Sequence, residues 1–368
     1  MDLLSNLALN LLPGIGVVRA KALVNYYESA EKVLSLSENE LKSNPALSPS
    51  IIETLSNQKI KAVAQLKAEK ELDFTLKKGI EIIPFNSEKF PPHLNECNDG
   101  PFLLFKKGKG VLKHQKNIAI VGARRATNYG KDFTAAIVRH LSNYNCCIVS
   151  GLAHGIDGAA HKAALQFNTP TIGILGHGLD TIYPTNHRDL AIEMLENGAL
   201  ISEFYSGTPS IPSNFPKRNR IVAGMVDAVI IVEAAIKGGA LVTAKIANTY
   251  QKDIYAVPGR INDTYSKGCN HLIKTQKAIL LDQPEELAME LGWEQFDLTK
   301  KFDENIFFEG MTPNESVVAK LLRAGSLDHA KLIENSKLSS SELATSLLML
   351  EMKNKIKTLP GQSYKLCF

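Results

Sequence analysis

Seven short apolar runs, separated by segments with helical periodicity, constrain the fold of this 368-residue chain more than any other feature. Nearly continuous apolar runs of this length are typical of parallel strands buried on both faces of a sheet. The runs are Ile118–Val121, Cys146–Val149, Thr171–Leu175, Ala199–Ser202, Ala228–Val232, Asp253–Val257 and Ala278–Leu281. The helical segments between them are Tyr129–Leu141, Gly158–Gln166, Arg188–Leu195, Arg218–Met225, Ala240–Tyr250 and Asn270–Lys274. The alternation predicts an α/β fold with an open, doubly wound, mostly parallel sheet of Rossmann-like type.

The loops that follow these strands are the expected location of a binding site. Right-handed crossovers place every such loop along one edge of a parallel sheet. Two of the loops carry clustered arginines and lysine, and three are rich in glycine. We therefore expect an anionic polymer or a nucleotide to bind along this edge.

The segment Asn214–Arg220, with the sequence NFPKRNR, is the strongest local signal. It places Lys217, Arg218 and Arg220 within four residues, and Pro216 suits the first turn of a helix. Cations are unfavourable at a helix N-terminus, and a bound phosphate would offset that cost. Two alternatives stay open: a solvated charged turn, or an arginine paired with Glu233 or Asp227.

The segment VGARRATNYG connects a predicted strand to a predicted helix. Gly122 permits close backbone approach to a ligand, and the helix N-terminus supplies free N–H groups. Its spacing differs from the dinucleotide fingerprint GxGxxG, and Arg124 and Arg125 occupy the middle of the loop. Arginine there favours direct pairing with phosphate, although a purely structural turn is the alternative.

The other loops contain histidine, serine and aspartate, but they do not predict catalysis or metal binding. Ser150 precedes Gly151, so the order required for a nucleophile elbow is missing. We interpret Asp157 as an N-cap and His161 as a packing or hydrogen-bonding residue. Asn186 resembles a cap of the next helix, with a functional contact as the alternative. No metal-ligand spacing is present.

The regions outside the α/β segment predict two smaller parts. Residues 1 to about 70 have the pattern of short helices, including one at Val17–Tyr27. The turn Leu12–Gly16 resembles the hairpin of a helix–hairpin–helix motif, and a plain structural turn is the alternative. Residues 72–112 suggest a connector with short strands at Ile80–Pro84 and Phe102–Phe105.

The C-terminal region predicts a linker over residues 293–310 and a small domain after it. A helix at Ser340–Met352 follows a turn near Leu338. The ending IKTLPGQSYKLCF predicts a hairpin that turns at Pro360-Gly361. A helix–turn–helix followed by a hairpin is the outline of a winged helix.

Composition narrows the class of protein. The net charge of +4 is too small to indicate nucleic-acid binding by itself, so clustering of charge is the informative property. Five cysteines without a CxxC pair fit a reducing cytoplasm, and the adjacent Cys146 and Cys147 should point to opposite faces of a strand. The N-terminus lacks a basic region, and no apolar run reaches membrane-spanning length, so we expect a cytoplasmic protein without membrane contact.

Six motifs, in this order, resemble the DNA-processing protein A family (DprA/Smf). They are VGARRATNYG, IVSGLAHGIDGAAHKAAL, LGHGLDTIYPTNHRDL, GALISEFYSGTPSIPSNFPKRNRIVAGM, IIVEAAIKGGALVTAKIA and YAVPGRINDTYSKGCNHLI. The resemblance implies a helical, SAM-like domain at residues 1–70, a Rossmann-like core with its connector at 71–292, and a winged-helix domain at 311–368.

The resemblance also implies a function. A family member is expected to bind and protect incoming single-stranded DNA, displace single-strand-binding protein and load the RecA recombinase during natural transformation. It implies a homodimer and no cofactor, metal or catalytic residue.

Carried over by position, the resemblance nominates a set of DNA-binding residues. Arg124 is the leading candidate for a phosphate contact, followed by Lys217, Arg218 and Arg220. Backbone groups of Gly122, Gly151, Gly155, Gly176 and Gly178 and the side chains of Asn186 and Arg188 complete the expected set. Many relatives carry lysine where this chain has Thr185, and His187 or Arg188 is the expected substitute.

Two alternatives remain at this stage. The first is a nucleotide-processing enzyme resembling the lysine-decarboxylase-like phosphoribohydrolases, although the chain has EAAIKGGALVTA where those enzymes have PGGxGTxxE. The second is a tail that reads duplex sequence. Its candidate recognition helix is poor in arginine, which disfavours that reading.

Overall fold

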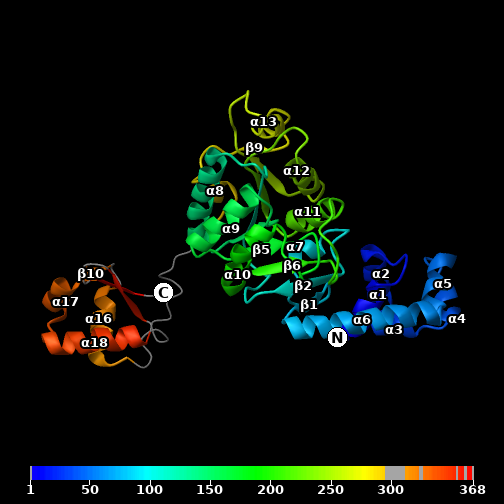
Figure 1. Cartoon of the computed structure of the whole chain (residues 1–368), viewed down its shortest axis with the longest axis horizontal. Helices are drawn as coiled ribbons and strands as arrows, with labels where there is room; N and C mark the ends of the chain where they lie inside the picture. Colours follow the sequence, from blue (N-terminus) through cyan, green and yellow to red (C-terminus); the bar gives the residue numbers. More distant parts are fainter. Residues whose placement is uncertain (1, 295–310, 323–325, 354, 360–362, 367–368) are drawn as a thin grey trace. The chain divides into compact units, whose positions relative to one another are not determined.

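A computed structural model describes residues 2–294, 311–322, 326–353, 355–359 and 363–366. The chain divides into two compact units, Met1–Phe296 and Asp297–Phe368 (Figure 1). Most of the expected linker at 293–310 lies outside the described residues. Within the described residues, no helix is both long and apolar enough to cross a membrane.

The first unit is built on a nine-stranded sheet in the order β1-β2-β6-β5-β4-β3-β7-β8-β9. Strands β3 to β9 are parallel, as the apolar runs predict. Their bounds are β3 (Asn117–Val121), β4 (Cys147–Ser150), β5 (Thr171–Ile174), β6 (Ala199–Ser202), β7 (Ala228–Ile231), β8 (Asp253–Ala256) and β9 (Ile279–Leu280).

The expected connector is part of this sheet. Strands β1 (Glu81–Pro84) and β2 (Leu103–Lys107) pair antiparallel, and β2 pairs antiparallel with β6. Phe102 and Leu104 are fully buried there. The connector prediction was therefore incomplete: its two strands were located, but they extend the sheet beyond β6.

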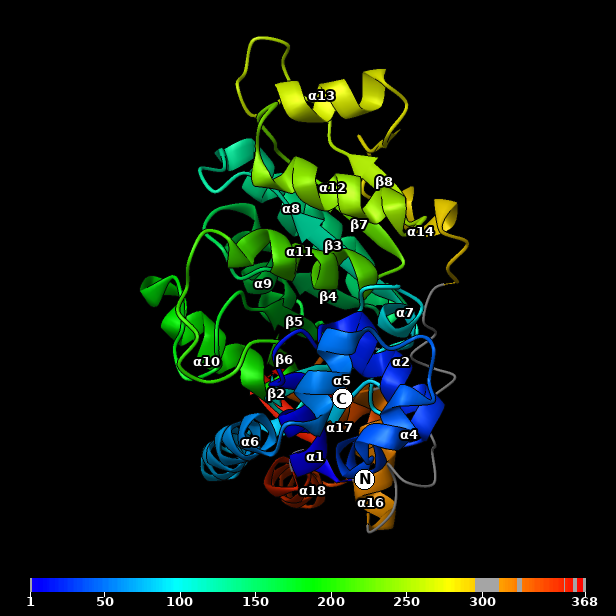
Figure 2. The same ribbon diagram turned by 90° about the vertical axis from the view of Figure 1, so that its right-hand side faces the viewer.

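Helices cover both faces of the sheet. Figure 2 shows α11 (Asn214–Gly224) and α12 (Gly239–Thr249) over one face, with α8 (Asn128–Leu141) and α9 (Ile156–Gln166) over the other. Helix α10 (Arg188–Asn197) packs beside α9, α13 (Lys267–Lys274) packs against β8, and the short α14 (Leu287–Glu290) follows β9 in the chain. Cys147 and Cys146 belong to separate apolar clusters, which confirms that their side chains point to opposite faces.

The strand order places a topological switch between β3 and β7. Strands β4, β5 and β6 continue to one side of β3, and β7, β8 and β9 continue to the other. The loops that leave β3 and β7 therefore diverge at their carboxyl ends. In open α/β sheets this is where a crevice for ligands forms.

The N-terminal region is helical, as predicted, and packs against the edge of the sheet at β1. Its helices are α1 (Leu3–Asn10), α2 (Val17–Tyr27), α3 (Ala30–Ser35), α4 (Glu38–Lys42), α5 (Pro49–Ser56) and α6 (Gln58–Lys78); a short α7 (Pro92–Asn95) lies between β1 and β2. Helix α6 runs past residue 70 to its C-cap at Gly79, where φ is 61°. We therefore propose Gly79 as the end of the helical region.

Two hydrogen-bonded contacts fasten this region to the sheet. The buried carboxylate of Glu71 accepts hydrogen bonds from the backbone N–H of Ser206 at 3.0 and 3.2 Å. The hydroxyl of Tyr205 donates to the carbonyl of Leu7 at 3.1 Å and accepts from Asn10. Both contacts reach the loop that runs from β6 to α11.

The second unit has the predicted winged-helix arrangement. Helices α16 (Pro313–Leu322), α17 (His329–Ser336) and α18 (Ser340–Met352) enclose an apolar core with a three-stranded sheet in the order β10-β12-β11. Its strands are β10 (Leu327–Asp328), β11 (Ile356–Leu359) and β12 (Ser363–Leu366). The predicted hairpin is β11 and β12, while its turn at Pro360-Gly361 lies outside the described residues.

Candidate nucleic-acid interface

A crevice of about 590 Å³ lies at the topological switch. The loop after β3, the loop after β7 and the first turns of α11 and α12 line it. We call it the switch crevice. Its lining includes Gly122, Arg124, Arg125, Asp157, Tyr183, Phe215, Arg218, Glu233 and Gly238.

Arg124 and two aromatic rings form its exposed part. The guanidinium carbon of Arg124 lies 5.2 Å from the centroid of the Phe215 ring. The Phe215 ring lies 6.2 Å from that of Tyr183, which is 47% exposed. Arg124 and Arg125 are exposed, and neither makes an ion pair with the described residues. Cation–π attraction to the Phe215 ring orients Arg124, and the guanidinium keeps N–H groups that can donate to an anion.

Arg218 lies beneath this surface and is only 5% exposed. Its guanidinium packs on Gly151, where a Cβ atom would overlap it. Burial lowers the pKa of Arg218 and raises the pKa of Asp157, and the charge of each residue opposes the shift of the other. The Nε of Arg218 has no hydrogen-bond partner among the described residues. Arg218 therefore supplies buried positive charge to the crevice.

Asp157 does not cap its helix, so that prediction was wrong. Helix α9 begins two residues earlier than expected, at Ile156, with Gly155 as N-cap at φ 79°. The Asp157 carboxylate accepts hydrogen bonds from the backbone N–H groups of Gly151 and Ala153. It thus ties the loop back onto α9 instead of starting the helix.

Arg220 is held inside the protein. It forms an ion pair with Glu203 and donates to the carbonyl of Asp99. The side chains of Arg220 and Glu203 are 14% and 12% exposed. The alternative carboxylates are used elsewhere, since Asp227 pairs with His93 and accepts from the backbone N–H of Asn117.

Lys217 is exposed but lines a different hollow from Arg124. That hollow, between α7, α11 and α12, also contains Arg220, Tyr250 and Lys252. Pro216 lines both hollows and separates them. Of the three cations in NFPKRNR, Lys217 is the one whose side chain faces solvent.

Glu233 holds the arginine loop in position. Its carboxylate accepts hydrogen bonds from the backbone N–H of Thr127 at 2.9 Å and from the Thr127 hydroxyl at 2.6 Å. The same hydroxyl caps α8 by accepting from the backbone N–H of Gly130. This contact joins the end of β7 to the start of α8. Sequence reasoning missed it because no local pattern marks a bond across 106 residues.

The predicted glycines mainly allow close packing. Gly155 has φ 79°, and a Cβ atom there would collide with the carbonyl of Ala123. A Cβ atom at Gly122 would meet the side chain of Ile156 at 2.5 Å. The backbone N–H of Gly151 donates to Asp157 and that of Gly178 to Thr208, so these two groups are already used. Gly176 is buried and lies against Phe215.

Asn186 and Arg188 do not line the switch crevice. Asn186 is exposed and lies in a short 3₁₀ turn, η2 (Thr185–His187), and the helix that follows has no side-chain cap. The prediction that Asn186 caps this helix was therefore wrong. Arg188 lines a separate hollow on the other side of the loop at 179–185.

His161 and Ser150 have structural roles, as expected. The Nδ1–H of buried His161 donates to the hydroxyl of Thr171 at 2.7 Å, because that hydroxyl donates to the carbonyl of Ile148. Burial lowers the pKa of His161 to about 3. Ser150 donates to the carbonyl of Ile120. The described part of the chain contains no cluster of three potential metal ligands.

A crevice with exposed and buried arginine at the switch of a doubly wound sheet defines a Rossmann-like protein with arginines at the ligand-binding edge of that fold class. Comparison with known proteins gives the family. The model of the DNA recombination-mediator protein A family matches residues 81–292, and the DprA winged-helix domain matches residues 310–362. The chain belongs to the DNA recombination-mediator protein A (DprA/Smf) family.

Three relatives illustrate the similarity. The chain is 39% identical to Protein Smf of Escherichia coli (strain K12) over 287 residues, which cover 76% of each chain. The X-ray structure of DprA from Streptococcus pneumoniae superposes with a TM-score of 0.58 at 31% identity, covering 77% of this chain and 99% of that one. DprA from Helicobacter pylori, studied for its single-stranded DNA binding mode, gives 0.54 at 31% identity, covering 58% and 97%.

Proposed function

We propose that the chain binds single-stranded DNA at the switch crevice and does not alter its covalent bonds. The observation that carries this proposal is the grouping of Arg124, Phe215 and Tyr183 at the exposed rim. A single strand presents phosphates and unpaired bases side by side. Guanidinium groups pair with phosphate, and aromatic rings stack on bases of any sequence. Single-stranded DNA binding by the Helicobacter pylori relative supports the assignment.

The crevice contributes to binding in two further ways. The N-terminus of α12 lines it at Gly238 and Gly239 and has no side-chain cap, so the N–H groups of Gly239 and Ala240 are available to an anion. Buried Arg218 lies in the lining beside Asp157, which offsets its charge, and its Nε–H has no hydrogen-bond partner among the described residues. Contacts of this kind hold the strand by its backbone and confer little sequence preference.

We favour DNA binding without chemical turnover over an enzymatic function. Two carboxylates line the crevice, and both are already engaged. Asp157 accepts hydrogen bonds from the backbone N–H groups of Gly151 and Ala153, and both oxygens of Glu233 accept hydrogen bonds from Thr127. We infer that Glu233 shapes the loop instead of acting on a glycosidic bond. Release of adenine from AMP by the purified protein would contradict this inference.

Family membership leads us to propose the later steps as well: protection of incoming DNA, displacement of single-strand-binding protein and loading of RecA during transformation. We also propose a homodimer. Exposed apolar side chains on the edge strand β9, Ile279 and Leu280, offer a self-complementary edge, and exposed Ile236 is a second candidate. Met225 is 1% exposed, so it cannot contribute to a dimer face in this fold.

The test compares two arginine substitutions of equal charge. Arg124→Ala removes the cation at the crevice, whereas Arg139→Ala removes an exposed arginine in the last turn of α8, about 17 Å along the helix from its start. We expect Arg124→Ala to weaken binding of oligo-dT about tenfold. The slope of the logarithm of the binding constant against the logarithm of the salt concentration should become shallower by about 0.7. Arg139→Ala should bind like the parent protein.

Fluorescence anisotropy across a salt series measures both quantities, and urea unfolding reports stability. Arg124 is exposed and lies outside the apolar core, so its variant should unfold at the same urea concentration as the parent. Equal oligo-dT affinity for Arg124→Ala and the parent protein at moderate salt would refute the proposed site. Lys217→Ala provides a second probe, with a smaller loss expected because Lys217 lies beyond Pro216.

A further inference from the structure

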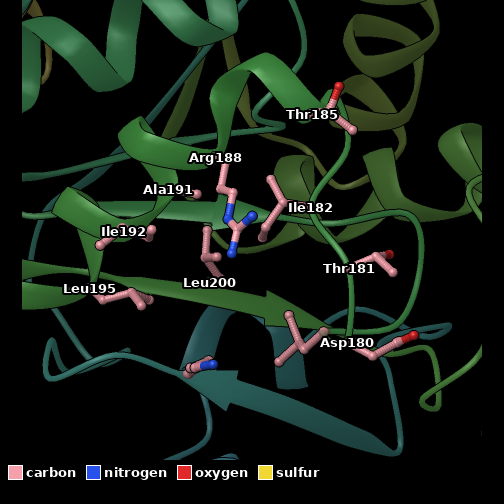
Figure 3. A pocket seen from close by; sticks show the side chains of 11 residues that line it. Asp180, Thr181, Ile182, Thr185, Arg188, Ala191, Ile192, Leu195 and Leu200 are labelled. Carbon is pink, nitrogen blue, oxygen red and sulfur yellow. The ribbon is translucent and has the colours of Figure 1, made fainter.

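A second hollow, of about 630 Å³, lies between α10, the edge of the sheet and the loop at residues 179–185 (Figure 3). Aliphatic side chains form its floor and walls, and two cations reach it from different elements. The residues that matter are Lys107 of β2, Arg188 and Ile192 of α10, Ile182 of the loop and Leu200 of β6. We call this region the α10 hollow.

The two cations of the hollow are unpaired within the residues that the structure describes. No described carboxylate forms an ion pair with Arg188 or Lys107. The guanidinium of Arg188 extends from α10 into the hollow, over Leu200, as Figure 3 shows. Asp180 stands at the rim, and one oxygen of its carboxylate accepts from the backbone N–H of Gly207 at 3.1 Å. The hollow is therefore complementary to an anion that carries an apolar or flat group.

One loop separates this hollow from the switch crevice. Tyr183 of the loop lines the switch crevice, while its neighbours Ile182 and Thr185 line the α10 hollow. A ligand that stacks on Tyr183 and continues over the loop reaches Arg188 next. Pro184 is buried, so the exposed part of the loop between the two hollows consists of its neighbours Tyr183 and Thr185.

We propose that the α10 hollow is a second subsite for the same single strand, with Arg188 pairing with a phosphate beyond the one held by Arg124. This inference rests on the function proposed above. Lys107 faces the next phosphate, and one base lies against Ile182 and Leu200. The occupant is single-stranded nucleic acid because the hollow is adjacent to a proposed phosphate site, with a single loop between them. Its unpaired cations also match a polyanion.

The subsite gives Arg188 a role that the motif comparison left open. Thr185 cannot pair with phosphate as lysine would, but it lines the same hollow as Arg188. The cation in this chain therefore comes from the first residue of α10 instead of the preceding turn. A base in the hollow would contact aliphatic side chains, so this subsite should add affinity through charge and little through stacking.

Oligonucleotide length separates the two subsites. We would measure binding of oligo-dT of about 4 and about 16 nucleotides to the full chain and to Arg124→Ala, Arg188→Ala and Arg139→Ala. Arg188→Ala should weaken binding of the longer strand about fivefold to tenfold, lower its salt slope by about 0.7, and leave the shorter strand unaffected. Arg124→Ala should weaken both lengths, and Arg139→Ala neither.

A second variant tests the hollow without removing arginine. Ile192 is 56% exposed, so Ile192→Glu places a negative charge at the hollow with little effect on folding, and it should also weaken only the longer strand. Unchanged binding of the longer strand to Arg188→Ala would overturn the subsite and leave the hollow for a protein partner. An equal loss at both lengths would also overturn it, because Arg188 would then belong to the first contact. Failure of Arg124→Ala to affect either length would instead refute the proposed function.

Discussion

The ion pair of Arg220 and Glu203 tests whether each cation of the NFPKRNR motif stabilises the fold or contacts DNA. Arg220→Met removes the cation and keeps much of its apolar stem. The side chain of Glu203 is only 12% exposed, and burial raises its pKa while the charge of Arg220 opposes that rise. Without Arg220, an uncompensated carboxylate remains in the interior.

The expected loss of stability is about 3–5 kcal/mol, the usual cost of removing one partner of a buried pair. A Coulomb energy of about 4 kcal/mol for two charges 4 Å apart at an effective dielectric constant of 20 gives the same scale. The hydrogen bond from Arg220 to the carbonyl of Asp99 is also lost. Adding Glu203→Gln to Arg220→Met removes the buried charge and should recover about 2 kcal/mol or more.

Urea unfolding of the parent, both single variants and the double variant gives the coupling energy directly. Binding of oligo-dT is measured on the same samples at a temperature where all are folded. We expect folded Arg220→Met to bind within about twofold of the parent, since Arg220 faces Glu203. A variant with unchanged stability and a tenfold loss of DNA affinity would refute this reasoning and make Arg220 a phosphate contact.

Two further predictions concern buried titratable groups. The pKa of His161 is about 3 in the folded chain and about 6.5 when unfolded, so its contribution to stability is complete above pH 6.5 and falls as the pH drops towards 3. Between pH 7.5 and pH 5 the parent should therefore lose about 2 kcal/mol more than His161→Gln in urea unfolding, and identical losses would contradict a neutral buried histidine. Burial raises the pKa of Cys146 to about 12 and holds the pKa of Cys147 well above its ordinary value, so neither thiol should react with iodoacetamide at pH 8 until the chain is unfolded. Mass spectrometry locates the label, and rapid labelling of native Cys146 would show that β4 opens readily.

The strands and most helices were predictable because they depend on local patterns. A strand such as Ala199–Ser202 is marked by its own apolar residues, and Val17–Tyr27 by helical periodicity after a Pro-Gly break. The antiparallel role of β1 and β2 was not predictable in this way. Prolines around them indicate a connector, whereas the pairing of β2 with β6 depends on an edge formed about 100 residues later.

The candidate site was predictable as a list of cations but not as an arrangement. Sequence reasoning placed Arg124 after β3 and Arg218 and Arg220 after β6, and the structure has them there, in the loop after β3 and in α11. It could not distinguish exposed arginines from buried ones. Asp157, whose charge acts on Arg218, belongs to another loop, and Glu203 pairs with Arg220, 17 positions further along the chain, only because the segment between them folds back. Lys107 was missed altogether, since β2 reaches the α10 hollow only through its pairing with β6.

The attachment of Glu71 and Tyr205 has a consequence for dissecting the chain. The loop between β6 and α11 leads to Phe215 and Lys217 in the first turn of α11. Hydrogen bonds to α1 and α6 hold this loop in place. Cutting the chain at Gly79 would remove Glu71, the hydrogen-bond acceptor of Ser206. It would also expose the rings of Tyr205 and Phe105, whose centroids lie 5.2 Å apart. The helical region therefore supports the binding surface indirectly. We expect a core that lacks this region to bind its ligand with lower affinity, although every contact residue is still present.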